Sequence, residues 1–198
     1  AALIGEAGKW QTIAQPWPET IGEWTHFLND ADGNAVARDL EVAEPRGVQW
    51  HADPIWHRNH SRNPGVSAMV SARGRVYGII DEGAVLHSTA SAKWYLVARD
   101  AFSGVRLWTR PIADWEGAKT KFRAQPAWLP RRLVAVGDKV YVTLALDSPV
   151  TQLNGATGET LKAFDATEHA QEIVVHKDVL YVVTGMPLTK DASFSVRG

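Results

Sequence analysis

The amino-acid sequence predicts an all-β fold built from short antiparallel strands. Apolar and polar residues alternate in short segments through most of the chain, as in half-buried strands. Turn-forming residues separate these segments, and helical periodicity is weak throughout. The third observation is nine tryptophans in 198 residues. Large aromatic side chains commonly pack between layered sheets, so this content favours layered β structure.

The hairpin at residues 98–108 is the clearest of these segments. Asp100 and Gly104 bracket a tight turn between two alternating segments, and Trp108 ends the second one. Gly104 suits the positive φ that such a turn demands. A second copy of the turn follows at residues 153–161 and contains Thr157 and Gly158. Recurrence at a spacing of roughly 50 residues indicates a repeat architecture, in which each unit needs neighbours to bury its faces.

Two complete units and the start of a third are predicted around these hairpins. The first unit, residues 66–112, has predicted strands at 66–71, 75–80, 94–98 and 105–108. The second unit, residues 130–165, has predicted strands at 133–136, 139–144, 150–153 and 159–164. A further unit starts in residues 171–198, with strands at 172–175 and 179–183. Four short antiparallel strands match one blade of a β-propeller.

The remaining residues are predicted to connect such units. Residues 1–22 are interpreted as the end of a preceding blade and a connector, because Gly8 stands before an alternating segment as Gly104 does. Residues 23–65 are interpreted as an irregular inter-blade segment. The whole chain, residues 1–198, is therefore predicted to be a segment of one partial β-propeller. Because propellers close with about four to eight blades, we expect the remaining blades in the same polypeptide or in a second chain.

Composition restricts the classes of function. Lys and Arg total 21 and Asp and Glu total 22, so the chain lacks the basic field that binds phosphates, and nucleic acid is not an expected partner. No segment approaches the roughly 18 apolar residues of a membrane span. The absence of cysteine excludes disulfides and thiolate metal sites. The sequence also contains no Gly-rich phosphate loop and no Gly-x-Ser-x-Gly elbow, which leaves a nucleotide enzyme or hydrolase without support.

The hairpin at residues 98–108 resembles the tryptophan-docking repeat of quinoprotein-type (PQQ-like) β-propellers. Ala98, Asp100, Gly104 and Trp108 match the pattern, and Ser103 stands where Thr is usual. In the second copy Thr157 and Gly158 match, Asn154 replaces Asp, and no Trp follows. More narrowly, residues 23–26, 100–104 and 129–138 look like the bacterial PQQ-like repeat proteins of planctomycete type.

The resemblance implies a fold more strongly than an activity, because one fold hosts many functions. It implies a periplasmic or cell-envelope location and makes Trp108 a docking residue between blades. One implied function is a binding or assembly scaffold, with an envelope protein as partner. The alternative is a fragment of a quinoprotein- or haem-dependent oxidoreductase, with its cofactor in the propeller channel.

The resemblance assigns no catalytic residue here. The dehydrogenases of the family hold PQQ with a calcium ion and an Asp base, and many also have a disulfide of adjacent cysteines. That disulfide is impossible in this chain. Neither the base nor the calcium ligands match particular positions. PQQ with calcium, or haem, therefore stays an open expectation.

One candidate ligand or metal site is the polar loop at residues 51–64. It contains His51, His57, Arg58 and His60, and imidazoles this close together could bind a transition metal or haem iron, or act as acid and base. The loop precedes the predicted innermost strand of the first unit, so we expect it near the central channel. The alternative is a polar surface loop.

A second candidate is a calcium loop. Asp30, Asp32, Asn34 and Glu41 have the first, third, fifth and twelfth spacing of an EF-hand. Ala35 takes the position where the sharp turn requires Gly, and no helices flank the loop, so the alternative is an Asx-rich turn that caps its own backbone. Arg131 and Arg132, at a strand start, could hold an anion but are more typical of a solvated face.

Overall fold

The all-β prediction is confirmed. The computed structural model describes residues 17–18, 20–53, 65–83, 92–118 and 125–185, and the backbone alone of residues 2–6 and 9–13. Within these residues the chain forms twelve strands and two short 3-10 turns, with no α-helix. All the strand pairings are antiparallel. No helix in these ranges is long and apolar enough to cross a membrane.

Sheet 1 is the four-stranded sheet that contains the central hairpin. Its strands, in spatial as in sequence order, are β3 (Val66–Ala72), β4 (Arg75–Asp81), β5 (Trp94–Asp100) and β6 (Arg106–Pro111). They agree with the four predicted strands, and β6 continues beyond Trp108. The register pairs Tyr77 with Ala98 and Ala98 with Trp108, which places these side chains on one face of the sheet.

Sheet 2 repeats this meander, and sheet 3 is a two-stranded hairpin. Sheet 2 consists of β7 (Leu133–Val136), β8 (Lys139–Thr143), β9 (Val150–Asn154) and β10 (Thr160–Ala163), again in sequence order. Sheet 3 consists of β11 (Ala170–His176) and β12 (Val179–Thr184). The predicted strands are again found. In sheets 1 and 2 the first strand, β3 or β7, is an edge strand.

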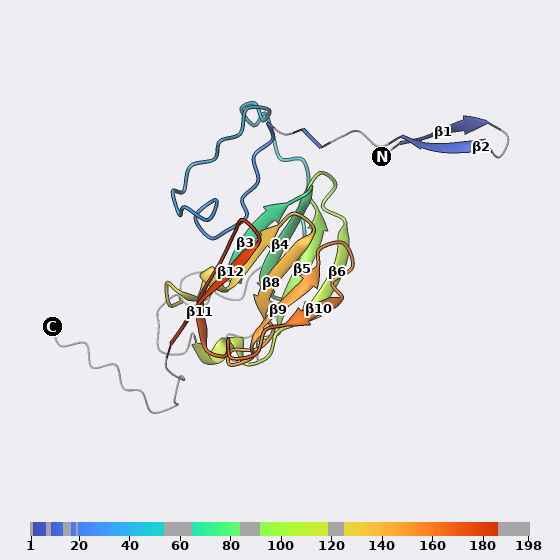
Figure 1. Cartoon of the computed structure of the whole chain (residues 1–198). Coiled ribbons are helices and arrows are strands. Elements are labelled where there is room, and N and C mark those ends of the chain that lie inside the picture. The colour runs from blue at the N-terminus through green and yellow to red at the C-terminus, as the bar shows by residue number, and fades with distance from the viewer. Residues whose placement is uncertain are drawn as a thin grey trace.

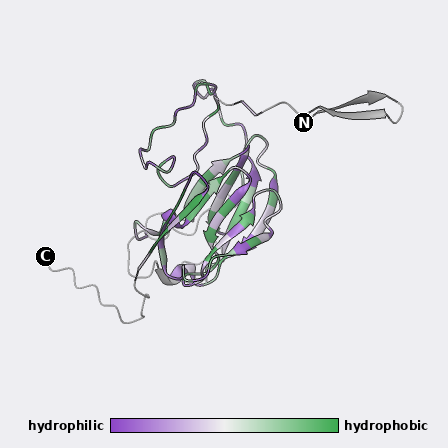
Figure 2. Ribbon diagram, viewed as in Figure 1, coloured by the Kyte–Doolittle hydropathy of each residue, from purple (hydrophilic) through white to green (hydrophobic). Residues whose placement is uncertain are grey.

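Strands β7, β8 and β9 of sheet 2 are covered on both faces, whereas β10 is exposed. One apolar cluster between sheets 1 and 2 contains Leu133 and Ala135 of β7, and a second cluster between sheets 2 and 3 contains Val134. Alternate residues of one strand thus enter different cores, as the two-residue period of a strand requires. Figure 2 shows hydrophobic residues along the strands of both four-stranded sheets. Burial of both faces therefore fixes the strand register.

The stack of sheets is open at both ends and does not close into a ring among the described residues (Figure 1). A tyrosine recurs at one position of each sheet: Tyr77 is 0% exposed and Tyr141 7%, whereas Tyr181 of sheet 3 is 54% exposed. At the other end of the stack, Met69 and Leu107 on the outer face of sheet 1 are exposed. Each end thus presents an apolar surface.

The flanking segments are irregular or separate from the stack. Strands β1 (Ala2–Glu6) and β2 (Lys9–Ile13) form a hairpin that projects away from the sheets (Figure 1). Residues 20–53 contain no strand, as predicted. The 3-10 turns η1 (Trp115–Ala118) and η2 (Leu129–Arg132) lie between sheets 1 and 2 in sequence.

Candidate functional site

Trp108 of sheet 1 lies against the β9–β10 turn of sheet 2. Its indole Nε1 donates to the carbonyl oxygen of Gly155 at 2.9 Å, and the Tyr77 hydroxyl donates to the same oxygen at 3.1 Å. A Cβ atom on Gly158 would lie 2.7 Å from the indole ring. The ring therefore approaches the turn as closely as it does only because residue 158 has no side chain.

Trp50 makes the same contact one sheet earlier, and the sequence reasoning missed it. Its Nε1 donates to the carbonyl oxygen of Ala101 at 2.9 Å, and a Cβ on Gly104 would lie 2.6 Å from the ring. Trp50 belongs to the irregular segment rather than to a strand. The available signal was its separation from Gly104, which is close to that between Trp108 and Gly158.

The two turns that receive these tryptophans have the same internal hydrogen bonds. Gly104 has φ +73° and donates its N–H to the Asp100 carbonyl at 2.9 Å, and Gly158 has φ +75° and donates to the Asn154 carbonyl at 2.8 Å. The Asp100 carboxylate accepts from the Ser103 hydroxyl at 2.8 Å and from Ser103 N at 2.7 Å, and these two hydrogen bonds lower the pKa of Asp100. The amide oxygen of Asn154 accepts from Ala156 N at 2.8 Å. Asn154 thus replaces Asp without loss of the turn.

The predicted docking residues therefore belong to two successive contacts between a tryptophan ring and a turn glycine, each of which we call a seam. Gly104 receives Trp50, whereas Trp108 reaches Gly158 of the next sheet. Thr157 accepts a hydrogen bond from Glu159 N within the second turn. Lys162 stands where Trp108 stands in sheet 1, and its Nζ lies 4.8 Å from the Phe164 ring centroid.

A short segment crosses the first strands of all three sheets. We call residues 23–29 the inner strap. The carbonyl of Trp24 accepts from Ser71 N of β3 at 2.7 Å, and that of Thr25 accepts from Ala135 N of β7 at 2.9 Å. The ring Nε2 of His26 accepts from Val175 N of β11 at 3.1 Å. One chain segment thus satisfies backbone donors in three sheets.

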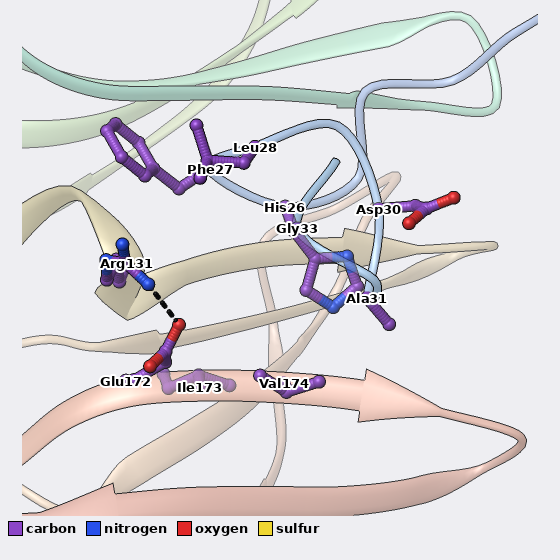
Figure 3. A pocket seen from close by; sticks show the side chains of 10 residues that line it. All are labelled: His26, Phe27, Leu28, Asp30, Ala31, Gly33, Arg131, Glu172, Ile173 and Val174. Carbon is purple, nitrogen blue, oxygen red and sulfur yellow. Dashed lines mark hydrogen bonds and ion pairs between the residues drawn. The ribbon is translucent and has the colours of Figure 1, made fainter. Parts of the chain in front are cut away.

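His26 is buried, with 6% of its surface exposed. Its Nδ1 lies 2.8 Å from the Thr25 hydroxyl oxygen, and that hydroxyl donates to the Asn29 carbonyl at 3.2 Å. The ring therefore carries its proton on Nδ1. Burial lowers the pKa of His26, although Asp30 and Glu172 act in the opposite direction. Figure 3 shows the ring near β11, beside a recess of about 50 Å³ that is much smaller than the roughly 300–1,000 Å³ of small-molecule pockets.

Arg132 corrects the expectation of a solvated arginine pair. Arg131 is partly exposed and pairs with Glu172 at 2.6 Å, but Arg132 is only 1% exposed. The guanidinium of Arg132 lies 5.4 Å and 5.7 Å from ring centroids of Trp115 and Trp128 and donates to the Leu146 carbonyl. Burial lowers the pKa of Arg132 to about 10.

Two of the predicted calcium-binding residues, Asp30 and Asp32, accept hydrogen bonds within their own loop. Asp30 accepts from Asp32 N and Asp32 accepts from Asn34 N, each at 2.8 Å, and Asp32 also pairs with Arg38. Glu41 accepts from the Thr20 hydroxyl. No group of three His, Asp or Glu side chains gathers anywhere in the described ranges. The hydrogen bonds of Asp30 and Asp32 are those of an Asx-rich turn, and calcium binding at this loop stays a prediction.

The histidine loop begins beside sheet 1. His51 is exposed and directly follows Trp50, which lies against the β5–β6 turn. Nearby, the Asp53 carbonyl accepts from Arg99 of β5 at 3.0 Å. His57, Arg58 and His60 lie outside the described residues. The hypothesis of a metal or haem site in this loop stays a prediction.

Compared with protein families and with curated proteins, the chain matches no family model and no curated protein.

Proposed function

We propose that this chain is a segment of a PQQ-like β-propeller that acts as a binding or assembly scaffold in the cell envelope. The observation that carries the proposal is the repeated seam, in which an indole donates to a backbone carbonyl beside a turn glycine of the next unit. Trp50 does so at Gly104, and Trp108 does so at Gly158. Two equivalent seams in succession support a regular arrangement of blades.

The four-stranded meander of sheets 1 and 2 also supports this proposal. A propeller blade is a four-stranded antiparallel sheet. The first strands of the three sheets, β3, β7 and β11, all contact the inner strap, so we interpret them as the innermost strands. The exposed face of Tyr181 corresponds to faces that the next sheet covers at Tyr77 and Tyr141. We infer that further blades, in the same polypeptide or a second chain, cover both ends.

The inner strap favours a scaffold over a cofactor enzyme. Backbone N–H groups of Ser71, Ala135 and Val175 would face the channel of a propeller, and this chain's own strap already accepts hydrogen bonds from all three. These three donors are therefore not available to bind a cofactor at this level of the channel. The surfaces that remain for a partner are the exposed ends and the loops.

Spectroscopy separates the scaffold from the oxidoreductase alternative. We expect the purified protein to show no visible absorption band and no change when PQQ with calcium, or haem, is added in stoichiometric amounts. A saturable spectral change would overturn the scaffold proposal. Variants with His57 and His60 replaced by alanine provide the control: loss of a bound chromophore or metal in these variants would assign the redox site to residues 51–64.

A further inference from the structure

We propose that His26 is an acid-sensitive latch, which fastens sheet 3 to the inner strap at neutral pH and releases it when the pH falls. The proposal concerns a conformational device and does not depend on the proposed scaffold function. It rests on the contact between a side-chain nitrogen of the strap and a backbone donor of β11.

The hydrogen-bond chain through the ring fixes which nitrogen can accept. The Thr25 hydroxyl donates to the Asn29 carbonyl, so its oxygen accepts from Nδ1–H of His26. The lone pair of Nε2 then faces the Val175 N–H. A proton on Nε2 would set two donors against each other in a buried site, and a buried donor without an acceptor is costly. Protonation and the contact with β11 are thus mutually exclusive.

The charged groups around the ring decide when it protonates. Asp30, on the same loop, and Glu172, on β11, favour the charged ring, whereas His176 at the end of β11 opposes it. Glu172 is paired with Arg131 at 2.6 Å, and this ion pair weakens the effect of the Glu172 charge on the His26 ring (Figure 3). Burial is the largest effect and holds the pKa of His26 below its usual 6.5.

The sign of the pH dependence follows from this lowered pKa. The unfolded chain binds a proton at His26 more readily than the folded chain does, so folding loses stability as protons are added. The contribution is complete above pH 6.5 and is lost as the pH falls through the lowered pKa of folded His26. The latch is therefore closed at neutral pH and opens in acid.

The release is local, because the other two contacts of the strap do not titrate. Ser71 and Ala135 donate to backbone carbonyls, of Trp24 and Thr25. Sheet 3 also keeps its apolar contact with sheet 2 through Ile173 and Val175. We therefore expect β11 to lose its contact with the inner strap at Val175 while the three sheets stay packed against one another.

Amide hydrogen exchange, measured by NMR on the whole chain at a series of pH values from 7.5 down to about 4, tests the latch. After correction for intrinsic exchange rates, we expect the protection of the Val175 amide to fall by about tenfold or more once the His26 ring is protonated, as for loss of a buried hydrogen bond. The amides of Ser71 and Ala135 are internal references and should change by less than about twofold. The midpoint of the Val175 change should coincide with the titration of the His26 ring.

Two variants complete the design. His26→Gln keeps a possible acceptor that does not titrate, so Val175 should show the same protection throughout the pH series. His176→Gln removes the neighbouring exposed histidine and should keep the wild-type pH dependence. Constant Val175 protection in the wild-type protein, equal loss at Ser71 and Ala135, or loss of the pH dependence in His176→Gln would each overturn the proposal.

Discussion

Replacement of Gly158 by alanine probes the seam between sheets 1 and 2. Gly158 has φ +75°, and a Cβ there would lie 2.7 Å from the Trp108 ring. Gly137 is a matched control, because it has φ +57° and a Cβ there would meet no atom within 4 Å. Both variants impose a left-handed backbone on alanine, but only Gly158→Ala displaces the indole.

The expected losses follow from these two terms. The left-handed conformation costs alanine roughly 1–2 kcal/mol at either position. Insertion of a methyl group into a packed contact costs about 1–3 kcal/mol more, and this term applies to Gly158→Ala alone. We therefore expect Gly158→Ala to lower the free energy of unfolding by about 2–5 kcal/mol and Gly137→Ala by about 1–2 kcal/mol.

Urea unfolding, followed by circular dichroism, measures both losses and their dependence on Trp108. Trp108→Ala alone should cost about 3 kcal/mol, because it empties the pocket at the seam and removes the hydrogen bond to Gly155. In that background Gly158→Ala should cost no more than Gly137→Ala. Equal losses for the two glycines in the wild-type background would refute the reasoning, as would a loss below about 0.5 kcal/mol for Trp108→Ala.

Three further predictions concern other contacts. Trp50→Phe keeps an aromatic ring but removes the donor to Ala101, so we expect a loss of about 1 kcal/mol in urea unfolding, and no loss would contradict that hydrogen bond. Arg132→Met removes a buried charge that forms no ion pair within the described ranges. Thermal unfolding should then show a change within about 1 kcal/mol or a gain, and a loss above about 3 kcal/mol would contradict this. Hydrogen bonds from Ser103 lower the pKa of Asp100 below 3.8, so its stabilisation is present above pH 3.8 and is lost as the pH falls through the lowered value. Asp100→Asn should flatten that part of the stability curve, and an unchanged curve would exclude the effect.

The strands were predictable because their signals are local. Alternation within β4 and β8, with turn residues such as Gly74 and Gly137 before them, places each strand without knowledge of its neighbours. The Asp100 to Gly104 turn was predictable for the same reason. Its repetition at Gly158 indicated that the units recur.

The contacts between sheets were less predictable, because they join residues far apart in the sequence. Trp50 lies in an irregular segment, and only the structure brings it to Gly104. His26 contacts Val175 although the two residues are 149 positions apart in the sequence. Arg131 and Arg132 are sequence neighbours, but the 3-10 turn η2 directs Arg131 toward Glu172 and Arg132 toward two indole rings. Local sequence patterns do not distinguish an arginine in a surface ion pair from one buried against aromatic rings.

A crystal structure of the whole chain tests the central claim most directly. We expect it to place the Trp108 ring over Gly158 and the Trp50 ring over Gly104, with sheets 1, 2 and 3 side by side and their first strands joined by residues 24–26. Two sheets closed face to face as a sandwich, with these indole rings in the interior between them, would contradict the account.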